Sequence, residues 1–114
     1  MKRGSTFKGK AFLFEGDLTS SLKIYPLDKD GRQTGTKVEI DRATIEFVKK
    51  VIGDKGRIQM GACRDNPAKQ SLGEMLHKRK KSPQWLSYIL PLLEKDNLIT
   101  HYKEGNAFWV KRKT

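Results

Sequence analysis

The sequence is poor in cysteine and has no long apolar segment. Its one cysteine, Cys63, excludes an internal disulfide and a cysteine-rich zinc site, so a reducing cytoplasm is the expected compartment. Ala11–Phe14 is among the longest apolar runs, far below the ~20 residues that a membrane span needs. Because no apolar stretch follows the first charged residues, we expect no secretory signal.

The groupings that catalysis and metal binding need are also missing from the sequence. It has no phosphate-binding glycine loop and no plausible catalytic triad. His77 and His101 have no partner at the spacing of metal ligands, and Cys63 is interpreted as a structural thiol. We therefore expect no enzyme, no metal and no cofactor.

Positive charge is what the sequence has in excess. Its 24 Lys and Arg outnumber 13 Asp and Glu, which gives a net charge of +11, and residues 41–114 hold most of it. The densest cluster is Lys78, Arg79, Lys80 and Lys81, directly before a segment of aromatic and hydrogen-bonding side chains. This pattern favours a nucleic-acid partner, with a solvated face, a protein partner or an anionic membrane surface as alternatives.

Residues 1–40 have the composition of β structure. Three stretches are rich in aromatic and aliphatic residues or alternate apolar with polar positions, namely 8–14, 22–26 and 38–40. Pro26 indicates that the second strand ends there or lies at an edge. We expect two or three short antiparallel strands, which cannot bury a core alone and so pack on the rest of the chain or on a second copy.

Two helices with a short strand between them are predicted next. Asp41 caps the first helix, whose apolar stripe ends at Gly53, and a strand covers 57–60. Asn66–Pro67 predicts the start of the second helix. Within that helix Gly73 costs about 1 kcal/mol relative to alanine, which close backbone packing would explain.

The third helix has the clearest pattern in the chain. It starts at Ser82–Pro83 and ends near Asn97, which can take the left-handed conformation. Its buried stripe is Leu86, Ile89, Leu90 and Leu93, which fall within about 100° of one another at helical spacing. Two strands over 98–102 and 107–111 follow, joined by a hairpin turn at 103–106.

This order of helix, strand, helix, helix and hairpin resembles the winged-helix family of helix-turn-helix proteins. The most specific piece is WLSYILPLLEKDNLI at 85–99, which is similar to that family's recognition helix leading into its wing. The resemblance implies an α+β fold, a three-helix winged helix-turn-helix with a C-terminal β-hairpin wing, covering 41–114. Residues 1–40 would be a short antiparallel β extension, packed on this domain or used for dimerisation.

The resemblance also implies double-stranded DNA as the partner. The third helix would enter the major groove and the wing would lie along the backbone. Carried onto this sequence, the nucleic-acid-binding residues are Lys78, Arg79, Lys80, Lys81, Ser82, Gln84, Ser87, Tyr88, Lys103 and Asn106. Transcriptional regulation is the expected setting, with a plasmid or phage DNA function close behind.

Three residues of the third helix can also be interpreted through packing or backbone geometry rather than through DNA contact. Trp85 borders the apolar stripe and is expected to pack in the core rather than touch DNA. Tyr88 lies on the polar arc, and its role stays open between contact and packing. Pro91 lies inside the helix and crowds the carbonyl of Ser87, which puts the groove fit of Ser87 and Tyr88 in question.

Two other interpretations compete with DNA binding. Gly53 and Gly56 are similar to the glycine loop of KH domains, which clamps single-stranded nucleic acid, although a second helix does not follow at once. A winged helix can also serve protein contact, because fold does not fix function. No membrane partner is expected, and a homodimer would bind two half-sites about one helical turn apart.

Overall fold

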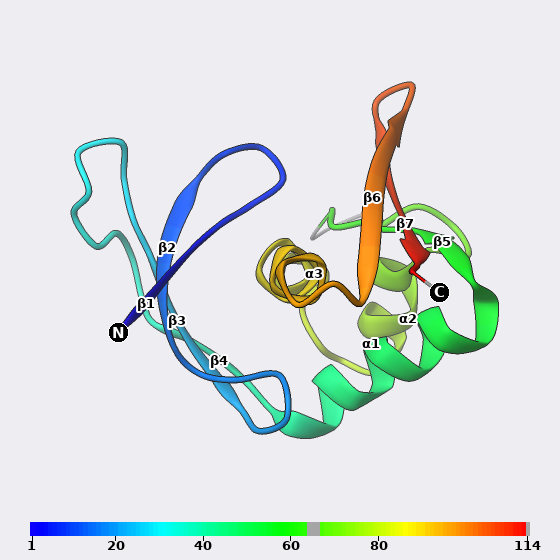
Figure 1. Cartoon of the computed structure of the whole chain (residues 1–114), viewed down its shortest axis with the longest axis horizontal. Helices are drawn as coiled ribbons and strands as arrows, with labels where there is room; N and C mark the ends of the chain where they lie inside the picture. Colours follow the sequence, from blue (N-terminus) through cyan, green and yellow to red (C-terminus); the bar gives the residue numbers. More distant parts are fainter. Residues whose placement is uncertain (64–66, 114) are drawn as a thin grey trace.

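A computed structural model describes residues 1–63 and 67–113 (Figure 1). Within these residues the chain has an α+β fold with three α-helices, two antiparallel sheets and a C-terminal β-hairpin. The first sheet has the strand order β1-β2-β3-β4, and the second has the order β5-β7-β6. Helix α3 lies between them and is seen along its axis at the centre of Figure 1.

The N-terminal sheet has one strand more than the sequence predicts. Its strands are β1 (Lys2–Ser5), β2 (Ala11–Gly16), β3 (Leu22–Pro26) and β4 (Val38–Ile40). The sequence gives no sign of β1, because this strand is short, polar and mostly exposed. The predicted first strand also began too early, since 8–10 belong to the β1–β2 connection. β3 ends at Pro26 as expected.

Helix α1 (Arg42–Lys55) begins where the sequence predicts and ends three residues later than predicted. The Asp41 carboxylate caps it by accepting a hydrogen bond from the Thr44 amide at 3.1 Å. The prediction that Gly53 ends the helix is wrong, because Gly56 takes the positive φ of 78° and donates back to Ile52. Gly53 therefore lies in the last turn of α1 and Gly56 is its C-cap, so strand β5 (Arg57–Gln59), and not a second helix, follows the glycines of the alternative clamp loop.

Helix α2 (Leu72–Lys78) starts later than predicted. Its N-cap is Ser71, whose hydroxyl accepts from the Glu74 amide at 3.1 Å, so Pro67 is not the first helical residue. Asn66 lies outside the described residues. The Glu74 carboxylate accepts in return from the Gln70 amide at 3.0 Å. Ser71-x-x-Glu74 is a capping-box spacing, and this signal in the sequence marks the true start of the helix.

The third helix follows its predicted pattern. Ser82 caps a 3-10 turn at Pro83–Trp85, which continues into α3 (Leu86–Lys95). The expected stripe is confirmed, since Leu86, Ile89, Leu90 and Leu93 are all buried. The backbone leaves the helix through Asn97 with φ 62°, the left-handed conformation that was predicted.

The C-terminal hairpin pairs with β5 and closes the second sheet. Its strands are β6 (Ile99–Glu104) and β7 (Ala107–Arg112), and its turn contains only Gly105 and Asn106, two residues fewer than expected. Trp109 and Val110 point to opposite faces of this sheet: Val110 is buried with Ile58 on the helix-facing side, and Trp109 faces away from it.

The buried apolar residues of both sheets and all three helices form one core cluster. Phe12 of β2 is completely buried and meets the Tyr88 ring of α3 edge-on, at 5.1 Å between ring centroids. Strand β1 also lies against α3, where the Lys95 ammonium is 3.5 Å from the Arg3 carbonyl. Within the described part of the chain, no helix is both long and apolar enough to cross a membrane.

Candidate nucleic-acid interface

The predicted basic cluster forms the turn between α2 and α3. Three of its four side chains lie beside groups of the protein itself: Lys78 is 3.6 Å from the Glu74 carboxylate, and Lys81 is 3.5 Å from that of Asp41. The Arg79 guanidinium stacks on the Phe47 ring at 4.2 Å. Lys80 has φ 60° and is exposed. Because ion pairs between exposed groups contribute at most about 1 kcal/mol, these cations can exchange their partners for phosphates.

Ser82 and Gln84 mark the end of α3 that adjoins this turn. The Ser82 hydroxyl accepts from the Gln84 amide at 3.3 Å, so this N–H at the positive end of the helix already has an acceptor within the protein. The Gln84 side chain is exposed, whereas Ser87 and Tyr88, farther along the helix, are half-buried. Of the predicted base-reading side chains, Gln84 therefore has the freest access to a ligand.

The remaining predicted residues meet in one groove. Gln84 lines it from the 3-10 turn before α3, Ser87 and Tyr88 line it from α3, and Lys103 and Asn106 line it from the hairpin. The groove has a volume of about 1080 Å³. Among the described residues that line it there is no carboxylate, and the polar groups are hydroxyls, amides, lysine ammonium groups and the Cys63 thiol. Apolar side chains such as Phe7, Met60 and Phe108 also line it. Such a lining suits a polyanion.

Tyr88 is more buried than its position on the polar face of the predicted helix suggests. Burial raises the pKa of its phenol above the ordinary value of 10.0. Its ring is the edge-on partner of Phe12, which the N-terminal sheet brings over α3. Trp85 likewise packs against the core, as predicted, and the Lys81 ammonium lies 5.8 Å from its ring centroid.

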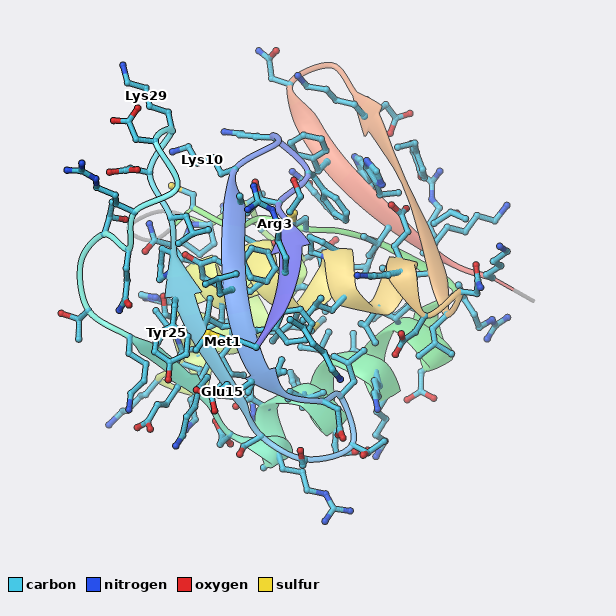
Figure 2. The ribbon with its side chains drawn as sticks, turned by 60° about the vertical axis from the view of Figure 1, so that its left-hand side comes forward. Met1, Arg3, Lys10, Glu15, Tyr25 and Lys29 are labelled. Carbon is cyan, nitrogen blue, oxygen red and sulfur yellow. The ribbon has the colours of Figure 1, made fainter. Side chains whose placement is uncertain are left out.

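Sequence reasoning missed the second wall of the groove. This wall is the β1–β2 connection, 6–10, which contributes Lys8 and Lys10. In Figure 1 the connection and the hairpin turn extend to the same side of α3. Figure 2 shows Lys10 at the end of the molecule where the hairpin turn also lies, and Tyr25 and Glu15 at the other end of the N-terminal sheet. Two lysines flanking a glycine were the only sequence signal.

Phe7 joins the two walls of the groove. Its ring stacks on the His101 imidazole with 3.8 Å between centroids and 9° between planes, and it lies 5.7 Å from Phe108. His101 is held in turn by Glu94, whose carboxylate contacts Nδ1 at 2.6 Å and accepts from the backbone amide at 2.8 Å. His101 thus has a packing role between Phe7 and α3.

A second depression lies on the other side of Phe7, along the C-terminal half of α3. It has a volume of about 700 Å³ and is lined by Arg3, Pro91, Glu94 and Lys95, among others. Because a carboxylate lies among its cations, it suits a polyanion less well than the groove at the start of α3.

The outer face of the second sheet carries another cluster that the sequence did not reveal. The Arg57 guanidinium lies 4.9 Å from the Trp109 ring and donates to the Tyr102 hydroxyl at 3.0 Å. Tyr102 and Trp109 are paired across the strands, with 6.5 Å between their centroids. These three groups already contact one another, so they are explained as the packing of this face.

In the described parts of the chain, no three His, Cys, Asp or Glu residues are grouped so that they could hold a metal ion. Comparison with known protein families, with curated proteins and with solved structures finds no match to this chain. The groove and the basic turn beside it are therefore the features of this chain that indicate a function.

Proposed function

We propose that this protein binds double-stranded DNA through the N-terminal end of α3, the basic turn before it and the β6–β7 hairpin. The order α1, β5, α2, α3, β6, β7 supports a winged-helix arrangement, with α3 as the recognition helix and the hairpin as the wing. Transcriptional regulation, or a plasmid or phage DNA function, is the setting that we propose for this activity.

One observation carries the proposal. Lysine and polar side chains from segments far apart in the sequence line the groove over α3 together with apolar ones, and no carboxylate is among the described lining residues. Gln84 lines this groove and follows the basic turn by three residues. A duplex that lies over the start of α3 would therefore meet cations on both sides of the exposed Gln84, whose amide can pair with adenine.

Other parts of the surface are less suited to a polyanion. On the N-terminal sheet Glu15 accepts from the Tyr25 hydroxyl at 2.8 Å, and Glu39 lies 3.5 Å from Lys37. Carboxylates among the cations weaken the field that attracts phosphates. The groove over α3 has no carboxylate among its described lining residues, so this contrast supports the groove, rather than the outer face of the N-terminal sheet, as part of the DNA-binding surface.

The test compares two variants that lose the same charge. One changes Lys78, Arg79, Lys80 and Lys81 to alanine; the control changes the exposed Lys23, Lys37, Lys50 and Lys55. Binding to a labelled random duplex is measured by fluorescence anisotropy at about 50 mM salt, where phosphate contacts are strongest. We expect the first variant to lose more than about 100-fold in affinity and the control to lose less than about tenfold. Equal losses in both would contradict the proposal.

Thermal unfolding of both variants separates lost contact from lost folding. Lys81 lies beside the Asp41 cap, so the first variant is expected to unfold a few degrees lower while remaining folded at the binding temperature. A folded variant that binds duplex as tightly as the parent would place DNA binding elsewhere on the protein.

A further inference from the structure

The β1–β2 connection is a compact, ordered loop rather than a loose one. The Thr6 amide donates to the Lys10 carbonyl at 2.8 Å, and the Thr6 hydroxyl accepts from the Lys10 amide at 3.0 Å. Gly9 has φ 86°, a conformation that favours glycine. These contacts turn the chain within five residues and leave Lys8 and Lys10 exposed on either side of Gly9.

Phe7 fixes this loop against the second sheet. Its stack on His101 and its contact with Phe108 bring a segment from the N-terminus alongside a hairpin about 95 residues later in the chain. Glu94 anchors His101 from α3 through two contacts. The loop, the recognition helix and the wing are therefore linked through side chains of all three elements.

This linkage places cations on both walls of one groove. Lys8 and Lys10 line it from the loop, Lys103 lines it from the wing, and Gln84 lines it from the 3-10 turn before α3. No carboxylate is found among the lining residues that the structure describes. The charge of the loop wall thus matches that of the wing wall, as expected if both face the same polyanion.

We propose that the β1–β2 connection is a second phosphate-binding loop for the same duplex. Lys8 and Lys10 contact the DNA backbone from the wall of the groove that faces the wing, and Phe7 positions them. This inference rests on the proposed DNA-binding function, and it gives the N-terminal sheet a direct part in binding. It predicts a footprint that is wider than α3 and the wing alone would produce.

The test measures the dependence of duplex affinity on salt in the full-length protein. Each lost phosphate contact lowers the magnitude of the log–log slope by about 1, so Lys8→Ala with Lys10→Ala should lower it by about 2. At about 0.1 M salt we expect the affinity to fall more than about tenfold. The matched control is Lys50→Ala with Lys55→Ala on α1, which lies across α3 from the two loops (Figure 1).

The outcomes separate this inference from the function on which it rests. If the parent protein binds duplex but the loop variant keeps the slope and affinity of the control, the second loop is excluded and the DNA-binding function remains. A parent protein that binds no duplex at about 50 mM salt would remove both claims.

Phe7 is tested as a positioning residue. Phe7→Ala should weaken duplex binding in the parent and have no further effect when Lys8 and Lys10 are already alanine. Phe7→Tyr keeps the ring and should restore binding. If Phe7 only stabilised the fold, Phe7→Ala would weaken binding equally in the parent and in the variant without Lys8 and Lys10. That result would contradict the positioning role. Thermal unfolding of each variant shows whether it is folded during the measurement.

Discussion

The backbone of Gly73 lies directly against the carbonyl of Gly61. A β-carbon added to Gly73 would come within 1.7 Å of the Gly61 oxygen, and the Gly73 amide donates to the Met60 carbonyl at 2.9 Å. This contact joins the first turn of α2 to the segment that follows β5. Because α2 leads directly into the basic turn, the contact helps to fix the position of the proposed interface.

Gly73→Ala should therefore destabilise the protein even though alanine is the better helix former. We expect the free energy of unfolding to fall by about 1–3 kcal/mol, because the backbone of Gly61 must move to admit the methyl group. Urea denaturation followed by circular dichroism measures this change. An unchanged or higher stability would mean that the two segments are not in contact.

Gly53→Ala, in contrast to Gly73→Ala, should stabilise the protein. Gly53 lies inside α1, and an added β-carbon would meet no atom within 4 Å. Alanine should raise the free energy of unfolding by about 0.5–1 kcal/mol, since it restricts the unfolded chain and favours the helix. A loss of stability at Gly53 would show that this residue is not helical and would revive the clamp-loop interpretation.

The Asp41 cap should make stability depend on pH. Burial raises the pKa of the Asp41 carboxyl, but hydrogen bonds from Thr44 and the nearby Lys81 charge outweigh it, so the pKa is lowered overall. Since the folded-state pKa lies below the unfolded value of about 3.9, the stabilisation is complete above that value and is lost as pH falls through the folded pKa.

Asp41→Ala should cost about 1 kcal/mol near neutral pH. The difference from the parent should shrink as unfolding is measured at pH values farther below the ordinary carboxyl pKa of 3.8, where the parent carboxyl becomes protonated in the folded state. A difference that is constant across this range would rule out the charged cap as its cause.

Phe12 tests whether the N-terminal sheet and the rest of the chain unfold together. The side chain is completely buried in the shared core, so Phe12→Ala should cost about 3–5 kcal/mol. Both tryptophans, Trp85 and Trp109, lie outside the N-terminal sheet. In Phe12→Ala, tryptophan fluorescence and far-UV circular dichroism should nevertheless show one and the same unfolding transition, shifted to lower stability. A tryptophan transition that stays in place would show that residues 1–40 unfold separately.

Elements with a strong local pattern could be predicted from the sequence. The α3 stripe, the Asp41 cap and the left-handed Asn97 each depend on residues within a few positions, and all three are confirmed. Helix boundaries between competing glycines or caps were predicted less well. Gly53 and Gly56 are equally plausible helix ends in the sequence, and the hydrogen bond from the Gly56 amide to Ile52 identifies the one that is used.

The groove could not be predicted, because its walls depend on contacts between distant segments. The stack of Phe7 on His101 joins residues 94 positions apart, and no local spacing encodes it. Phe12, which is also distant in the sequence, packs against Tyr88, whose role the helical pattern alone left open between contact and packing. Sequence reasoning therefore found the α3 and hairpin side chains of the groove and missed the Lys8 and Lys10 wall.

The most direct test of the account is the salt dependence of duplex binding by the unaltered protein. A labelled random duplex and a matched single-stranded RNA are titrated by fluorescence anisotropy at about 50 and 200 mM salt. About six phosphate contacts predict a log–log slope near −5 for the duplex, or roughly a thousandfold loss of affinity over this range. Binding of the RNA alone, or of neither nucleic acid at the lower salt, would contradict duplex DNA binding.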